Sequence, residues 1–216
     1  MKRYDIVMFD LDGTLTESGE GITNSVAYAL KKFGIEPPER SKLYKFIGPP
    51  LIDSFENFCG FSREKATLAV KYYREYFAEK GIFENSVYSG VPELLQKLKE
   101  HGKRLVIATS KPQQFAERIL QKFNLYCFFE YICGSTMDET RGKKSEVIEY
   151  IIKELNLTDR SRIIMVGDKE HDVLGALQNG VDSIGVLYGY GSCNELKAAG
   201  ATYIAESVGD IQNILL

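Results

Sequence analysis

Residues 4–16, YDIVMFDLDGTLT, place two aspartates at the end of a continuous apolar run. Such a run is typical of a strand that is buried on both faces of a parallel sheet. Asp10 and Asp12 follow it at once, and Gly13 then lets the chain turn. Carboxylates this close repel one another, and a bound divalent cation offsets that repulsion. The stretch therefore predicts the first strand of an α/β fold and part of a functional site, with a simple turn as the alternative.

Further apolar runs alternate with helical segments along the rest of the chain. Buried strands are expected at 103–109, 161–168 and 182–189, and shorter ones at 129–135 and 201–207. Helices are expected at 91–102, 113–125, 144–157 and 172–180. This alternation predicts a doubly wound, Rossmann-like parallel sheet.

Residues 17–85 interrupt the alternation. They contain three helical segments, at 20–35, 51–61 and 62–82, and no convincing strand. An insertion after the first strand falls at the carboxyl edge of the sheet, where open α/β sheets bind ligands. We therefore expect an all-helical cap domain at 17–85 over a core domain made of 1–16 and 86–216.

Composition limits the classes of partner. A net charge of −3 gives no electrostatic reason to expect a nucleic acid polymer. No stretch approaches the roughly 18 apolar residues of a membrane span, and the N-terminal run lacks signal-peptide features. The 4 scattered cysteines indicate reduced thiols rather than disulfides or a zinc site. We expect a cytoplasmic monomer or weak homodimer that acts on a small molecule, without membrane or nucleic acid partners.

Polar residues follow the predicted strands at one edge of the sheet, because the carboxyl ends of parallel strands meet there. Those expected near Asp10 and Asp12 are Thr109, Ser110, Lys111, Lys143, Lys144, Asp168 and Asp172. Carboxylates bind Mg²⁺, an aspartate can attack phosphorus, and lysines and hydroxyls hold phosphate oxygens. The set is the one that metal-assisted phosphoryl transfer needs.

Four motifs in this order resemble the haloacid dehalogenase-like (HAD) hydrolase superfamily. They are DLDGT at 10–14, ATS at 108–110, a lysine, and GDKEHD at 167–172. The chain looks most like the phosphoglycolate phosphatase-like and 5′-nucleotidase-like branch with a helical cap. The resemblance implies a Mg²⁺-dependent phosphatase that hydrolyses a small phosphorylated metabolite, of the phosphoglycolate or nucleoside 5′-monophosphate type, through a phosphoaspartate.

The resemblance also implies roles for single residues. Asp10 would be the nucleophile and a metal ligand, and Asp12 the general acid and base, whose backbone carbonyl also binds the metal. Asp168 would be the third metal ligand, while Asp172 would organise the water around the metal. Lys144, preferred over Lys143, would orient the phosphate. The implied phosphate- and substrate-binding set is Asp10, Asp12, Gly13, Thr109, Ser110, Lys144 and, in the turn at 45–55, Gly48.

Several alternatives stay open. A phosphosugar mutase of the same superfamily would return the phosphate to a second hydroxyl, and a non-catalytic module could share the fold. A dehalogenase is less expected because Asp12 and Asp168 suit phosphate chemistry. Asp168 could instead cap the helix that starts near Glu170, Asp172 could have a purely structural role, and Thr109 could be a simple helix cap. The glycine-rich segment 188–196 is interpreted as a tight turn, since it lacks the spacing of a dinucleotide loop.

Overall fold

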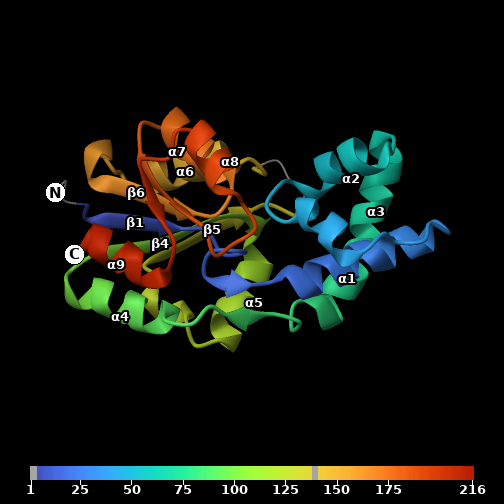
Figure 1. Ribbon diagram of the computed structural model, residues 1–216, viewed down its shortest axis with the longest axis horizontal. Coiled ribbons are helices and arrows are strands. Elements are labelled where there is room, and N and C mark those ends of the chain that lie inside the picture. Colours follow the sequence, from blue (N-terminus) through green and yellow to red (C-terminus); the bar gives the residue numbers. More distant parts are fainter. Residues whose placement is uncertain (1–3, 138–140) are drawn as a thin grey trace.

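The computed structural model describes residues 4–137 and 141–216. Its main sheet has parallel strands in the order β5–β4–β1–β6–β7–β8 (Figure 1). These strands are β1 (Ile6–Phe9), β4 (Arg104–Pro112), β5 (Tyr131–Ser135), β6 (Ile163–Gly167), β7 (Asp182–Val186) and β8 (Tyr203–Ala205). The predicted α/β class is confirmed, including the short strand expected at 129–135.

Strand β1 lies between β4 and β6, at the middle of the sheet. Its last residue, Phe9, is level with Ile107 on β4 and with Val166 on β6. The chain fills the sheet outward from β1 on one side and then crosses to the other side. Ligands of open α/β sheets bind at such a switch point, so the residues after these three strands occupy the expected place for a site.

Both faces of the sheet are covered by helices. In β1, Val7 and Phe9 face one buried apolar cluster, whereas Ile6 and Met8 face another. Helices α6 (Lys144–Glu154), α7 (Glu170–Gln178) and α8 (Cys193–Ala198) lie on one side in Figure 1. Helices α4 (Val91–Glu100), α5 (Gln113–Lys122) and α9 (Val208–Leu215) lie on the other. Burial on both faces explains the continuous apolar runs in the sequence.

The inserted helices stand at one end of the sheet (Figure 1). They are α1 (Gly19–Lys32), η1 (Arg40–Phe46), α2 (Leu51–Cys59) and α3 (Arg63–Tyr76). Helix α3 packs against both α1 and α2. Phe55 of α2 belongs to the same buried cluster as Phe9 of β1, so apolar packing is continuous between the two parts. Their division into separate domains stays a prediction.

Three local features differ from the sequence expectations. The helix expected at 62–82 ends at Tyr76 and continues as a π-helical turn, η2 (Phe77–Gly81). Two short strands, β2 (Thr16–Glu17) and β3 (Ser86–Val87), pair antiparallel where the chain enters and leaves the inserted helices, although no strand was predicted at 17–85. Helix α8 begins at Cys193, within the segment interpreted as a turn. Two-residue strands and one-turn changes of helix type leave no periodicity to read.

Within the described residues, no helix combines the length and the apolar character that crossing a bilayer requires.

Candidate active site

Asp10 and Asp12 lie directly after β1, at the middle of the carboxyl edge of the sheet. The Asp10 N–H donates to Val166 O at 2.9 Å, which extends the pairing of β1 with β6 by one residue. Gly13 then turns the chain with a φ of +81°, which disfavours any side chain. A Cβ at Gly13 would also overlap the carboxylate of Asp168. The tight turn therefore brings two distant motifs together and buries both Asp10 and Asp12.

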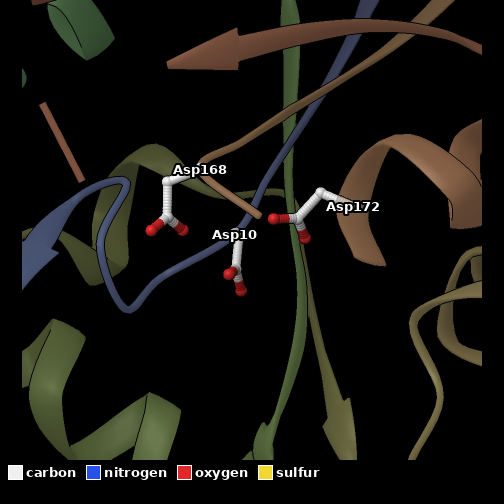
Figure 2. Close-up of side chains that lie close together, drawn as sticks. All are labelled: Asp10, Asp168 and Asp172. Carbon is white, nitrogen blue, oxygen red and sulfur yellow. The ribbon is translucent and has the colours of Figure 1, made fainter. Parts of the chain in front are cut away.

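Figure 2 shows Asp10, Asp168 and Asp172 with their carboxylates turned toward one another. Asp168 follows β6, and Asp172 lies in the first turn of α7. One carboxylate oxygen from each of the three lies within 4.8 Å of the other two, and all three residues are buried. The carboxylate of Asp12 is not part of this group.

The surroundings disfavour the ionised forms of Asp168 and Asp172. Burial, reinforced by the charges of Asp172 and Asp10, raises the pKa of Asp168 well above its usual range. Burial also raises the pKa of Asp172 to about 6, against the opposing attraction of Lys144. Strongly perturbed acids in a cleft are characteristic of sites that bind cations or transfer protons.

Lys144 is the lysine that reaches these carboxylates. Its Nζ lies 2.8 Å from Asp10 Oδ1 and 2.7 Å from Asp172 Oδ1, and it donates to Ala108 O at 2.8 Å. Burial lowers its pKa, but the two carboxylates outweigh burial and raise the pKa to about 12. Lys143, the alternative weighed from the sequence, is exposed and precedes α6. Of the two lysines, Lys144 is the one placed beside Asp10.

Thr109, Ser110 and Lys111 lie near the end of β4, where the register with β5 shifts after Ala108. Thr109 is buried, and its Oγ1 accepts a hydrogen bond from the Lys111 N–H at 3.2 Å. The Lys111 Nζ forms an ion pair with Asp12 Oδ2 at 2.9 Å. The sequence grouped Lys111 with the site but gave it no role. Its position directly after Thr109 and Ser110 was the available signal.

A cavity opens over these residues and occupies about 660 Å³, counting its open mouth. Asp10, Asp12, Thr109 and Ser110 line its polar part, and Gly48 contributes to the opposite wall. Apolar and aromatic side chains from the inserted helices and their connections complete that wall: Ile22, Phe46, Pro49, Pro50, Leu51, Tyr73 and Phe77. The chemistry-bearing residues come from the sheet, and most of the apolar wall comes from the insertion.

The loop after β7 supports Asp168. The Tyr190 N–H donates to Asp168 Oδ2 at 2.7 Å, and the Tyr190 hydroxyl donates to Glu17 Oε1 at 2.7 Å. A Cβ on Gly189 would overlap both Asp168 and the carbonyl of Gly13, so only glycine lets the loop pass this closely. The sequence identified the glycines of this loop but not its contact with the site, because the partners are far apart along the chain.

The charges at the site suit a divalent cation. The four aspartates carry four negative charges when ionised, whereas ion pairs with Lys111 and Lys144 supply two positive charges. The excess is therefore two negative charges in a buried place, where an unbalanced charge is costly. Buried carboxylate oxygens are the hard ligands that Mg²⁺ prefers. Asp10, Asp168 and Asp172 each offer a carboxylate oxygen to such a cation, and Asp172 is distinguished by its pairing with Lys144 and the Lys169 N–H.

Comparison with known proteins identifies the family. A model described as haloacid dehalogenase-like hydrolase matches residues 7–186. The chain is 44% identical over 213 residues to a 5′-nucleotidase from Pseudomonas aeruginosa, covering 99% of this chain and 96% of the relative. It is 36% identical over 203 residues to tyrosine-protein kinase PtkA from Mycobacterium tuberculosis, covering 94% and 68%. The crystal structure of a predicted phosphatase from Clostridium acetobutylicum superposes with a TM-score of 0.96, at 50% identity and 98% coverage of both chains. The resemblance seen in the sequence is thus confirmed, and the chain belongs to the haloacid dehalogenase-like hydrolase family.

Proposed function

We propose that the protein is a Mg²⁺-dependent phosphomonoesterase that works through a phosphorylated Asp10. The observation that carries the proposal is the position of Asp10 in the cavity. It lies between Lys144, at 2.8 Å, and the carboxylates of Asp168 and Asp172. A nucleophile beside a fixed cation and a candidate metal group can approach a phosphate that carries negative charge. Relatives that are named as phosphatases support hydrolysis of a phosphate ester.

Mg²⁺ would be held by carboxylate oxygens of Asp10 and Asp168 and by the backbone carbonyl of Asp12. When bound, it supplies positive charge that lets an anionic nucleophile meet an anionic substrate. Asp172 would not bind the metal directly but would orient Lys144, because its oxygens accept from Lys144 and from the Lys169 N–H. The perturbed pKa values of Asp168 and Asp172 return toward their ordinary range once a cation offsets the repulsion.

The reaction has two displacements at phosphorus. In the first, an Asp10 oxygen forms a bond to phosphorus while the bond to the leaving oxygen breaks, and Asp12 gives that oxygen a proton. In the second, water attacks phosphorus, Asp12 takes a proton from it, and the Asp10 oxygen leaves. Lys144, Thr109 and Ser110 hold the remaining phosphate oxygens throughout.

The substrate is a small organic phosphate, and its leaving group can be bulky because the cavity extends beyond the phosphate position. Phosphate bound at Asp10 points its ester oxygen toward the apolar wall formed by Phe46, Tyr73 and Phe77. The apolar and aromatic wall suits the base of a nucleoside 5′-monophosphate, and the 44% identical relative is named 5′-nucleotidase. A compound of the phosphoglycolate type fills less of the cavity, and relatives with that name are less similar to this chain.

The alternative reaction is transfer of the phosphate to an acceptor other than water. A mutase or a kinase carries out such a transfer, whereas a phosphatase does not. The similarity to PtkA makes transfer to a hydroxyl worth testing. A mutase would retain the phosphoenzyme until a second hydroxyl replaces water. Release of inorganic phosphate in step with alcohol release distinguishes hydrolysis from both.

The test is turnover of a panel of phosphorylated metabolites by wild type and by Asp10→Asn, with Mg²⁺ and with EDTA. Wild type is expected to release phosphate only with the metal and to form an acyl phosphate that hydroxylamine cleaves. Asp10→Asn should lose both properties, whereas Asp210→Asn, a helix-capping aspartate of α9, should keep them. Near-wild-type turnover by Asp10→Asn would exclude the nucleophile assignment, and absent turnover across the panel would favour a non-catalytic module.

A further inference from the structure

The ion pair between Lys111 and Asp12 is buried and separate from the carboxylate group around Lys144. Lys111 Nζ lies 2.9 Å from Asp12 Oδ2, and the two side chains are 5% and 10% exposed. Both residues line the cavity. A buried ion pair holds its partners in a fixed geometry, because breaking it leaves an uncompensated charge.

Three further contacts hold Lys111 in place. Its N–H donates to Thr109 Oγ1, and its Nζ lies 4.4 Å from the centre of the Phe77 ring, at the start of η2. Its backbone carbonyl passes so close to Gly134 of β5 that a Cβ there would overlap it. The lysine therefore connects the irregular end of β4 with the inserted helices, and its ammonium has little freedom to leave Asp12.

The pair leaves one oxygen of Asp12 available. Asp12 Oδ2 accepts from Lys111, whereas Asp12 Oδ1 is buried and has no hydrogen-bond partner among the residues that the structure describes. Because Oδ2 faces the ammonium of Lys111, Oδ1 is the oxygen of Asp12 that remains available to a bound group. Asp12 Oδ1 is one of several buried side-chain atoms of the described residues that lack a hydrogen-bond partner, and Asp12 also lines the cavity in which a ligand would bind.

We propose that Lys111 is a positioning residue, which anchors Asp12 by Oδ2 so that Oδ1 faces the leaving oxygen of the substrate. The inference rests on the proposed function, because it gives Asp12 the role of proton donor. In the first displacement, the Oδ1–H bond breaks as the leaving oxygen takes the proton, and Asp12 ends as a carboxylate paired with Lys111. Lys111 neither gains nor loses a proton.

A misplaced proton donor has a specific kinetic signature. An alkyl alcohol is a poor leaving group and needs the proton, whereas p-nitrophenolate leaves readily without it. Losing the anchor should therefore reduce kcat/KM for an alkyl phosphate and spare it for p-nitrophenyl phosphate. The ratio kcat/KM reports only the steps through formation of the phosphoenzyme, so the later role of Asp12 with water does not enter it.

The experiment compares Lys111→Met with wild type on glycerol phosphate and p-nitrophenyl phosphate. Methionine keeps the unbranched chain beside Phe77 but removes the charge. We expect kcat/KM for glycerol phosphate to fall by about 10²-fold, the usual contribution of a general acid, while that for p-nitrophenyl phosphate changes little. Lys111→Arg should restore much of the loss. Lys122→Met is the matched control, because Lys122 also lies over a phenylalanine ring, 4.9 Å from that of Phe83, and should match wild type on both substrates.

A double variant and the pattern of losses on the two substrates show whether Lys111 acts through Asp12. In an Asp12→Asn background, Lys111→Met should add no further selective loss, because the donor is already absent. Equal losses on both substrates, or no loss on either, would overturn the inference. If Lys111→Met does not fold, Lys111→Leu, which also removes the charge, is compared with wild type on the same two substrates. Failure of the proposed function is distinguishable, since it appears as an Asp10→Asn variant that still turns over p-nitrophenyl phosphate.

Discussion

Neutralising Asp172 should stabilise the metal-free protein even though it damages the site. Asp172 is buried, and its surroundings raise its pKa from 3.8 to about 6. At about pH 7, ionising it therefore costs about 3 kcal/mol more in the folded than in the unfolded chain, since one pKa unit is worth about 1.4 kcal/mol. Asparagine has nearly the same shape and avoids this cost. An amide has a single oxygen and can accept from Lys144 or from the Lys169 N–H but not from both, so we expect the net gain to be reduced to about 1–2 kcal/mol.

The assay is thermal unfolding of wild type and Asp172→Asn, with excess EDTA and with excess Mg²⁺. For a chain of this length, each kcal/mol shifts the midpoint temperature by about 2–4 °C. Without metal, Asp172→Asn should therefore melt several degrees above wild type. With Mg²⁺, wild type gains the free energy of metal binding, so the difference between the two proteins should shrink or reverse.

The matched control is Asp210→Asn. Asp210 has the same position in α9 that Asp172 has in α7, the third residue of the helix, and accepts the Ser207 N–H at 2.9 Å. It is half-buried and is not part of the carboxylate group, so its replacement should weaken the helix cap equally with and without Mg²⁺. A metal-free Asp172→Asn protein that melts below wild type would refute the reasoning, because the raised pKa would then not reflect a cost to folding.

The same site gives three other expected outcomes. The free energy of unfolding of metal-free wild type should fall as the pH rises from about 4 to about 7, because Asp168 and Asp172 have raised pKa values in the folded protein and their ionisation opposes folding. Chemical unfolding across this pH range measures that free energy. Excess Mg²⁺ should make it depend less on pH. Gly189→Ala should displace Asp168 and raise the Mg²⁺ concentration needed for half-activation by about 10–100-fold. Gly209→Ala is the control and should leave this concentration unchanged, because a Cβ at Gly209 would lie 3.6 Å from its nearest atom. Lys144→Met should reduce kcat by about 10²–10³-fold in steady-state assays, whereas comparable activity of Lys144→Met and the exposed-site variant Lys143→Met would contradict the assignment.

The fold was largely predictable because its strands are buried on both faces. The runs at 103–109, 161–168 and 182–189 could not be exposed without a large loss of apolar burial, so their place in the sheet follows from composition alone. The pairing of Thr16–Glu17 with Ser86–Val87 could not be predicted in the same way. Two residues carry no periodicity, and their partners are far apart in the chain.

The site was predictable to the extent that its residues follow strand ends. Asp10 lies near Asp168 and shares the cavity with Thr109, because parallel strands bring their carboxyl ends to one edge of the sheet. The partner of Asp12 could not be predicted, since it depends on the register shift at the end of β4. The contact of Tyr190 with Asp168 likewise depends on the close approach of two loops, which glycine permits but does not specify.

The turn after β1 separates two carboxylates that the sequence places side by side. Asp10 meets Lys144 and the two other carboxylates, an arrangement that favours a bound cation and a nucleophile near phosphate. Asp12, two residues later, leaves that carboxylate group and pairs with Lys111 under the inserted helices. Different surroundings give chemically identical groups different roles, as acid–base pairs in enzymes require. Because Lys111 also contacts Phe77, a change in the position of the inserted helices acts on Asp12 more directly than on Asp10.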